Sequence, residues 1–333
     1  MILEDAKMPK VTVLMPVYNT KEEYLRETID SILGQTFTDF EFLIINDAST
    51  DKRVREVVLS YDDDRIVYVE NEKNLGISES SNKGITLAKG EYIARQDHDD
   101  VSLPKRLEKE VCYLDEHPDV GVCSCWFEMF PKKKITKYPH KNNDIKEMLF
   151  LSGDPISHSA SMIRKSVLTE NNVFYKDEYR YAEDYALWVD LADKTNFYSL
   201  PEILLKYRWF GENASVVFGD VQRKNAFNLR LNGLKTLLSG MSEEEESVCV
   251  KVYEKKKITT DELLIMGKML KRTERRADKP WKKNVWLLFY QKALRLTIYD
   301  GNLLSVMRSE ESLSLPCFQK AFYLVKVWLK SVL

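Results

Sequence analysis

The first third of the chain alternates short apolar runs with segments of helical periodicity. Apolar, β-rich runs predict strands at residues 11–18, 40–46, 66–69, 92–96 and 120–127. The first two runs are mostly apolar, without a strict alternation of apolar and polar residues, which is typical of strands buried on both faces. Short strands that alternate with helices predict an α/β fold, in which a mostly parallel sheet has right-handed crossovers and helices on both faces.

Apolar residues three and four positions apart predict the intervening helices. These helices are expected at about residues 20–34, 78–89, 104–116 and 183–194. Thr20 with Glu23 predicts a capping box at the start of the first helix, and Gly34 predicts its end. Beyond about Asp220 the pattern becomes helical and increasingly basic.

Polar side chains follow three of the predicted strands. Tyr18 and Asn19 follow the first strand, Asp47 follows the second, and a cluster at residues 97–100 follows the fourth. In open parallel sheets, ligands bind beyond the carboxyl ends of the strands. We therefore expect these side chains to converge on one edge of the sheet and to form the functional site there.

The cluster at residues 97–100 has the sequence Asp-His-Asp-Asp. Alternate carboxylates placed directly after a buried strand repel each other unless a cation lies between them. A hard divalent cation such as Mg²⁺ or Mn²⁺ takes oxygen ligands of this kind and neutralises a departing diphosphate. The alternative is a solvated acidic turn that caps the helix beginning at Pro104.

Further motifs stand in a fixed order along the chain. They are Met15–Asn19 (MPVYN), Asn46–Asp51 (NDASTD), Asn74–Ile77 (NLGI), Asn82–Gly84 (NKG), the acidic cluster and Tyr181–Trp188 (YAEDYALW). In this order they resemble glycosyltransferase family 2, and the resemblance covers residues 11 to about 215. It implies a GT-A fold and an inverting transfer of a sugar from a nucleoside-diphosphate sugar, with a uridine nucleotide as the expected donor.

The resemblance also implies roles for individual residues. The donor is expected to contact Pro16, Tyr18, Asn19, Asp47, Asn74, Gly76, Asn82, Asp97, Asp99 and Arg208. Within this set, Asp47 reads the base. A divalent cation, Mn²⁺ or Mg²⁺, is expected on Asp97, Asp99 and His158. Leu205 stands where processive polysaccharide synthases carry a glutamine, which favours the addition of single sugars.

The acidic pair Glu183 and Asp184 stands where the family places its general base, at the start of a helix. Acids are favoured at a helix N-terminus, and a carboxylate there can accept the proton of an attacking acceptor hydroxyl. We expect Asp184 to be the base, with Glu183 and Trp188 binding the acceptor. The alternative is that both acids only cap the helix.

The predicted division places a catalytic domain at residues 1–218, with a nucleotide-sugar half at about 10–128 and an acceptor half at 129–218. Residues 219–333 form a helical, basic region in which Lys and Arg are interleaved with Trp, Phe and Tyr. The composition of residues 268–333 is consistent with two structures. One is a basic amphipathic surface that contacts an anionic membrane. The other is a helical subdomain that packs on the catalytic domain or on a second copy of the chain. The first alternative favours a lipid-linked oligosaccharide as the acceptor, and the second allows a homodimer.

Composition narrows the function further. The net charge of −2 argues against a nucleic-acid partner, and the sequence shows neither a signal peptide nor an apolar run long enough to span a bilayer. We therefore expect a cytoplasmic protein. If it binds a membrane, we expect it to bind the inner face of the cell membrane. Glycine-rich phosphate loops are absent after the first strand, which disfavours nucleotidyltransferases and dehydrogenases. A catalytically silent binding or scaffold protein with the same fold is the remaining alternative.

Overall fold

A computed structural model describes residues 8–211, 213–238, 240–276 and 278–296. The chain divides into two compact units. The first, here called the sheet unit, comprises residues 1–149 and 153–226, and the second, the helical unit, comprises residues 150–152 and 227–333. The predicted boundary between residues 218 and 219 stays a prediction.

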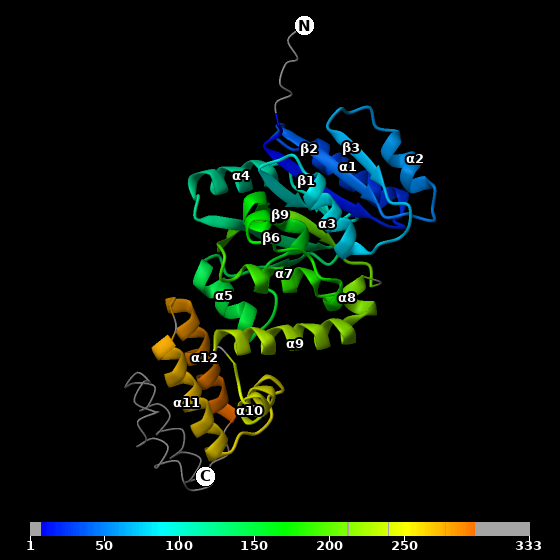
Figure 1. The fold of residues 1–333 in the computed structure, drawn as a ribbon. Coiled ribbons are helices and arrows are strands. Elements are labelled where there is room, and N and C mark those ends of the chain that lie inside the picture. Colours follow the sequence, from blue (N-terminus) through cyan, green and yellow to red (C-terminus); the bar gives the residue numbers. More distant parts are fainter. Residues whose placement is uncertain (1–7, 212, 239, 277, 297–333) are drawn as a thin grey trace. The chain divides into compact units, whose positions relative to one another are not determined.

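The strands and helices predicted for the first third of the chain are present in the predicted order (Figure 1). A short helix at Arg53–Leu59 and a two-residue strand at Val101–Ser102 were not predicted. The strands are β1 Val11–Val17, β2 Phe40–Asn46, β3 Ile66–Glu70, β4 Tyr92–Arg95, β5 Val101–Ser102, β6 Val120–Phe130, β7 Lys134–Thr136, β8 Met162–Arg164 and β9 Asn196–Arg208. The helices are α1 Glu22–Leu33, α2 Arg53–Leu59, α3 Ile77–Leu87, α4 Arg106–Glu116, α5 Asn142–Leu151, α6 Lys165–Glu170, α7 Glu183–Leu191, α8 Ala214–Val217, α9 Gly219–Leu237, α10 Glu243–Tyr253, α11 Thr260–Arg276 and α12 Pro280–Leu296. Single 3₁₀ turns lie at His158–Ala160 and Asp177–Tyr179.

The sheet is mixed, as predicted. Its strand order is β3-β2-β1-β4-β8-β6-β9-β5, with β7 paired to β6. Strands β3, β2, β1 and β4 are parallel, and β6 is parallel to β9. The short strand β8 runs antiparallel between β4 and β6 and joins these two parallel parts. The α/β fold class is therefore confirmed, while the insertion of β8 was not predicted.

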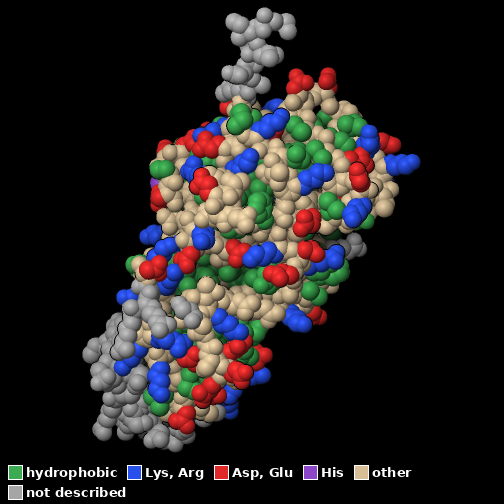
Figure 2. All heavy atoms as spheres, in the orientation of Figure 1, with side chains coloured by type: hydrophobic (Ala, Val, Ile, Leu, Met, Phe, Trp, Pro, Cys, Tyr) green, Lys and Arg blue, Asp and Glu red, His purple; other side chains and the backbone are tan. Residues whose placement is uncertain are grey.

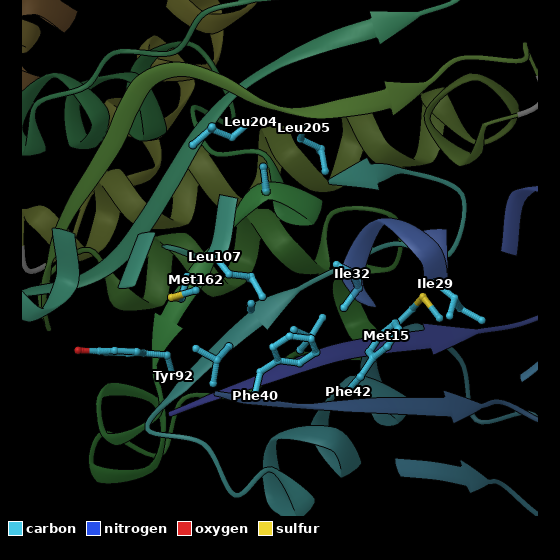
Figure 3. Packing of buried hydrophobic residues seen from close by; sticks show 14 of the residues in the cluster. Met15, Ile29, Ile32, Phe40, Phe42, Tyr92, Leu107, Met162, Leu204 and Leu205 are labelled. Atoms are coloured by element: carbon cyan, nitrogen blue, oxygen red, sulfur yellow. The ribbon is translucent and has the colours of Figure 1, made fainter. Parts of the chain in front are cut away.

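Apolar side chains cover both faces of the central strands. On one face, Met15 of β1 packs with Ile29 and Ile32 of α1 and with Phe42 of β2 (Figure 3). On the other face α3 lies so close that a Cβ added at Gly84 would overlap the side chain of Leu14. This two-sided burial explains why the runs for β1 and β2 are mostly apolar.

One local prediction is wrong. Helix α1 begins at Glu22 with Lys21 as its N-cap, and no side chain caps the first turn. Thr20 therefore does not form the predicted capping box with Glu23. The acids of the first turn, Glu22 and Glu23, still favour this helix start through the helix dipole.

The aromatic side chains of α12, on which part of the membrane interpretation rested, are buried. Trp281, Trp286, Phe289 and Tyr290 are at most 3% exposed. They lie in the core of the helical unit, where Phe289 packs against Tyr253 with ring centroids 4.9 Å apart. In the described part of residues 268–333, the interleaved aromatic residues are thus core residues of a helical subdomain. The remainder of this predicted region, residues 297–333, lies outside the described residues.

Charged side chains of both signs are interspersed on the face of the sheet unit that Figure 2 shows. Among the described residues, no helix combines the length and the apolar character that crossing a bilayer requires.

Close approach of two backbone segments at Gly90 gives a test of the sheet packing. A Cβ at this position would lie within 3 Å of backbone atoms of Val11, Thr12 and Tyr92, which cannot move without disturbing β1 and β4. We expect Gly90→Ala to lower the free energy of unfolding by about 1–3 kcal/mol, as overpacking does. Denaturant titration measures this change.

Gly219→Ala is the matched control, because the added methyl group meets only the flexible end of the Arg223 side chain. The control should leave stability unchanged or raise it slightly, since alanine favours a helix over glycine. Equal losses in the two variants would contradict the packing described for Gly90.

Candidate active site

A cleft of about 540 Å³ lies at the carboxyl edge of the sheet, where the site was predicted. Its acidic side chains come from three segments far apart in sequence, the turn after β4, the segment between α5 and β8, and the start of α7. Side chains from β1, from the segment before β8 and from the end of β9 complete the wall. The lining residues that matter below are Pro16, Asp97, Asp99, Tyr138, Asp154, His158, Tyr181, Glu183, Asp184, Tyr207 and Trp209.

Buried polar groups hold the acidic turn after β4. The hydroxyl of Thr28 donates to the backbone oxygen of Asp100 at 2.8 Å, and the amide of Arg208 donates to Asp100 Oδ1 at 2.9 Å. The Asp100 side chain is fully buried. Asp100 therefore anchors the turn, while Asp97 and Asp99 are the carboxylates that reach the cleft.

Arg95, for which the sequence predicted no role, organises one wall of the cleft. Its guanidinium is buried, and Nη2 donates to Asp97 Oδ1 at 2.9 Å. Nε donates to His158 Nε2 at 3.0 Å, and the Tyr175 hydroxyl lies 2.8 Å from the same nitrogen. Burial, and then the charge of Arg95, lower the pKa of His158 to about 3, so the imidazole is neutral.

These contacts do not support His158 as a metal ligand, because its Nε2 accepts a hydrogen bond from Arg95. Within the described residues, no three His, Cys, Asp or Glu side chains are grouped to hold a metal ion. The three-ligand set of Asp97, Asp99 and His158 is thus not assembled. A cation here would take protein ligands from the two aspartates and the remainder from a diphosphate and water, an arrangement common for Mg²⁺.

The environment of Asp99 fits a divalent cation. Burial raises the pKa of this carboxyl group, and the neighbouring charge of Asp97 raises it further. Arg208 Nε donates to the backbone oxygen of Asp99 at 2.7 Å, and no ion pair reaches its carboxylate in the described part of the chain. Two adjacent, partly dehydrated carboxylates are costly without a positive charge between them.

Glu183 and Asp184 occupy the first turn of α7 and line the same cleft. Asp184 Oδ1 accepts a hydrogen bond from the amide of Tyr185 at 2.7 Å. Glu183 is 8% exposed, and its Oε2 has no partner among the described residues. Burial, and then the charge of Asp184, raise the pKa of Glu183 to about 7. Burial, and then the charge of Asp97, raise the pKa of Asp184 to about 6, which suits a base that works near neutral pH.

The predicted contact of Trp188 with the acceptor is not supported. Its side chain is fully buried, and it does not line the cleft. The indole packs edge to face against the ring of His158, with centroids 6.3 Å apart. Trp188 lies on the core side of α7, whereas Glu183 and Asp184 lie on the cleft side.

Asp154 is a cleft residue that the sequence did not reveal. Burial raises the pKa of this carboxyl group well above its usual range, and the charge of Asp184 adds to the effect. Asp154 Oδ1 accepts from the amide of Ile156 at 2.9 Å. The residue lies in an irregular segment with no periodicity, so only its position opposite α7 marks it as part of the site.

At the end of β2, Asp47 is buried, and its carboxylate accepts hydrogen bonds from within the protein. Oδ1 and Oδ2 accept from the amides of Leu75 and Gly76, each at 2.8 Å, and Asn71 Nδ2 donates to Oδ1 at 2.7 Å. Asn74 Nδ2 reaches the Asp47 backbone oxygen at 3.3 Å. These bonds hold the loop before α3 against the end of β2. The role of Asp47 in reading a base stays a prediction.

Two predicted asparagines likewise shape the loops near the cleft. Asn19 has a left-handed backbone (φ 46°), and its Oδ1 accepts from the amides of Thr50 and Asp51 at 2.9 and 3.2 Å. Asn82 pairs with the backbone of Tyr175 in both directions, at 2.9 Å each. Both amides therefore position loops.

The first strand end contributes directly to the cleft and its surroundings. Pro16 lines the cleft, whereas Tyr18 is 43% exposed and does not. The ring of Tyr18 is therefore available to a ligand that extends beyond the cleft, and its donor contact stays a prediction.

Arg208 is engaged on the side of the turn away from the cleft. Its guanidinium forms an ion pair with Glu27 and lies 4.2 Å from the ring centroid of Tyr24 and 4.5 Å from that of Phe130. Its side chain is 10% exposed. The structure gives Arg208 a role in bracing the Asp99–Asp100 turn and does not place it against a diphosphate in the cleft.

Several proteins with similar sequences are described as glycosyltransferases. An uncharacterized glycosyltransferase of Methanocaldococcus jannaschii is 35% identical over 208 residues, which cover 60% of this chain and 71% of the relative. The amylovoran biosynthesis glycosyltransferase AmsE of Erwinia amylovora is 29% identical over 203 residues, covering 59% of this chain and 75% of AmsE. Fold, cleft and relatives together define the chain as a glycosyltransferase. It belongs to glycosyl transferase family 2, whose family model matches residues 12–171.

A solved structure shares the fold. S. aureus TarS 1–349 in complex with UDP-GlcNAc superposes with a TM-score of 0.59 at 16% identity, over 87% of this chain and 93% of that chain. In a structure with a longer TarS chain, the match covers 53% of that chain. The predicted GT-A fold is thereby confirmed. At this identity the likeness concerns the fold alone.

The raised pKa of Glu183 predicts a pH-dependent stability. In the unfolded chain this carboxyl group titrates near its usual 4.5, and in the folded protein near 7. Between these values the folded state binds more protons than the unfolded state, so the contribution of Glu183 to stability falls as pH rises from about 4.5 to 7. Glu183→Gln, which cannot ionise, should therefore melt higher than the wild type at pH 8, by roughly 2–4 °C per kcal/mol recovered.

At pH 4.5 the difference in melting temperature between Glu183→Gln and wild type should shrink, which calorimetry at both pH values measures. The exposed Glu79, in the first turn of α3, provides the control substitution Glu79→Gln. A difference for Glu183→Gln that stays constant with pH would contradict the raised pKa.

Proposed function

We propose that this glycosyltransferase moves a single sugar, a hexose or N-acetylhexosamine, from a uridine-diphosphate sugar to an acceptor hydroxyl with inversion of the anomeric configuration. The observation that carries the proposal is the convergence of two carboxylate pairs on one cleft. Asp97 and Asp99 approach it from the end of β4, and Glu183 and Asp184 approach it from the start of α7. TarS, which shares the fold, binds UDP-GlcNAc, and this supports the choice of donor.

In this proposal the two pairs divide the work. The turn after β4 binds the diphosphate side of the donor, with Asp97 held in place by Arg95. Asp184 accepts the proton of the acceptor hydroxyl as that oxygen attacks the anomeric carbon, and Glu183 binds a neighbouring acceptor hydroxyl. Attack on the face opposite the leaving diphosphate inverts the anomeric centre, with oxocarbenium character in the transition state.

A divalent cation, Mn²⁺ or Mg²⁺, is part of the proposal. Asp99 and the free oxygen of Asp97 would hold it, and when bound it neutralises charge on the departing diphosphate. The raised pKa of Asp99, caused first by burial, supports this assignment, because a nearby positive charge would relieve the cost of the buried anion.

We propose that the acceptor is a glycan or a lipid-linked oligosaccharide in surface polysaccharide or glycoconjugate synthesis. The relative AmsE is named for amylovoran biosynthesis, which supports a polysaccharide product. Contact with an anionic membrane surface is a further part of the proposal, and the basic residues of α11 and α12 support it. The aromatic side chains of α12 do not, because they are buried.

Donor binding can be tested with thermal unfolding of wild type and Asp99→Asn in the presence of UDP, UDP-sugars, GDP-mannose and a thymidine-diphosphate sugar, each with Mn²⁺, Mg²⁺ or chelator. We expect one nucleotide to raise the melting temperature only with metal, since a ligand at 100 times its Kd stabilises by about 2.7 kcal/mol. Asp99→Asn should lose most of this shift.

The exposed Asp62→Asn is the control for loss of a surface carboxylate, and it should behave like the wild type. If no nucleotide stabilises the folded wild-type protein, the transferase proposal fails and a silent scaffold with this fold becomes the better account.

If Asp184 is the base, its loss should impair sugar transfer without impairing binding of the donor. Asp184→Asn should lower kcat by roughly 10²–10⁴-fold while leaving the donor-induced thermal shift intact, because the carboxylate acts on the acceptor. In the wild type, kcat/KM should rise with pH through about 6, where Asp184 loses its proton. Release of nucleoside diphosphate from the donor, measured with a glycan acceptor fraction, gives both quantities.

The exposed Asp220→Asn is the matched control and should keep the wild-type rate and pH profile. Full turnover by Asp184→Asn would remove this residue from the mechanism.

A further inference from the structure

Two basic side chains of the helical unit lie near the ring of Tyr253, and the charge of a third, Lys255, acts on one of them. Arg230 comes from α9, Lys255 follows α10, and Lys292 comes from α12. The guanidinium carbon of Arg230 lies 5.6 Å from the ring centroid of Tyr253, and the ammonium nitrogen of Lys292 lies 5.5 Å from it. Three segments distant in sequence thus bring positive charge to the end of α10.

This group differs from the other basic residues of the unit, many of which have acidic partners. Lys251 pairs with Glu262, and Arg272 pairs with Glu245 at 3.0 Å. None of Arg230, Lys255 and Lys292 forms an ion pair in the described part of the chain. Glu254, the acidic neighbour of Lys255 in sequence, forms its ion pair with Lys256 at 2.7 Å.

The packing makes this concentration of charge costly. Lys292 is partly buried, and burial together with the charges of Arg230 and Lys255 lowers its pKa. Arg230 Nε is buried and has no hydrogen-bond partner among the described residues. An aromatic ring offsets part of the cost of a nearby cation, but like charges that share dehydrated space need an anion. Lys255 is exposed, so the cluster is open to solvent.

We propose that Arg230, Lys255 and Lys292 form a binding site for a phosphate group, separate from the catalytic cleft. A guanidinium presents planar paired donors that match phosphate oxygens, and the two ammonium groups act as point charges beside it. The phosphate belongs either to a lipid headgroup or to a free phosphorylated ligand. The inference does not depend on sugar transfer, because every residue involved lies in the helical unit.

Site-specific chemistry on the full chain tests the proposal. We would follow acylation of Lys292 by mass spectrometry, at a fixed pH and with chelator present, as inorganic phosphate or pyrophosphate is added. Bound anion stabilises the charged ammonium, so acylation of Lys292 should slow severalfold while that of the exposed Lys283 on the same helix does not change. Equal protection of Lys292 and Lys283 from acylation would overturn the proposal. So would the absence of any protection of Lys292, whether phosphate or vesicles are added.

Variants provide the second arm. Arg230→Gln and Lys255→Gln should weaken phosphate protection of Lys292 by about tenfold or more, and Lys283→Gln should not. Lys255 is exposed, so its variant keeps the test valid if Arg230→Gln fails to fold. Equal weakening by Lys283→Gln would mean unspecific attraction and would refute a defined site.

Vesicles separate the two sources of phosphate. Sedimentation with phosphatidylglycerol vesicles, compared with phosphatidylcholine vesicles, reports binding to an anionic headgroup. If the protein binds phosphatidylglycerol vesicles, and if Lys255→Gln reduces this binding while Lys283→Gln does not, the site belongs to a lipid headgroup. Protection of Lys292 by phosphate without such vesicle binding assigns it to a free phosphorylated ligand.

Discussion

The position of the acidic turn after β4 depends on a buried arginine at the start of α4. Arg106 Nη2 donates to the backbone oxygen of Arg95 at 2.7 Å, at the end of β4, and reaches that of Ser161 at 3.3 Å, just before β8. Its counter-ion is Glu110, one helical turn later and equally buried. Because buried charges must be paired and hydrogen-bonded, this group ties α4, β4 and β8 together with little freedom to rearrange. The acidic residues that follow β4 are thereby held at the mouth of the cleft.

The cleft itself concentrates negative charge that the fold does not neutralise. Arg95 compensates Asp97, but the carboxyl groups of Asp99, Glu183 and Asp184 all have raised pKa values, each caused first by burial. Such an arrangement lowers the stability of the free protein and favours ligands that bring positive charge or protons to the cleft. The proposed cation, diphosphate and acceptor hydroxyl would each relieve part of this unfavourable charge.

Several residues predicted to contact a ligand bind distant parts of the protein instead of facing the cleft alone. The amide of Asn82 pairs with Tyr175, and the guanidinium of Arg208 pairs with Glu27, in each case a residue far away in the sequence. No spacing rule can reveal such pairs, because they depend on which segments the sheet brings together. Trp188 shows the same limit, since helical periodicity alone does not tell which face of α7 meets the core.

The sequence by itself determined the alternation of strands and helices, the apolar strands β1 and β2, and the location of polar residues at strand ends. These features follow from local periodicity and from the geometry of parallel sheets, and they were sufficient to predict both the fold class and the acidic cleft. Only the tertiary structure decided that β8 enters between β4 and β6, that Arg95 and Asp154 belong to the site, and which carboxyl groups titrate near neutral pH. Burial and the distance between charges set these properties, and both arise from contacts between segments far apart along the chain.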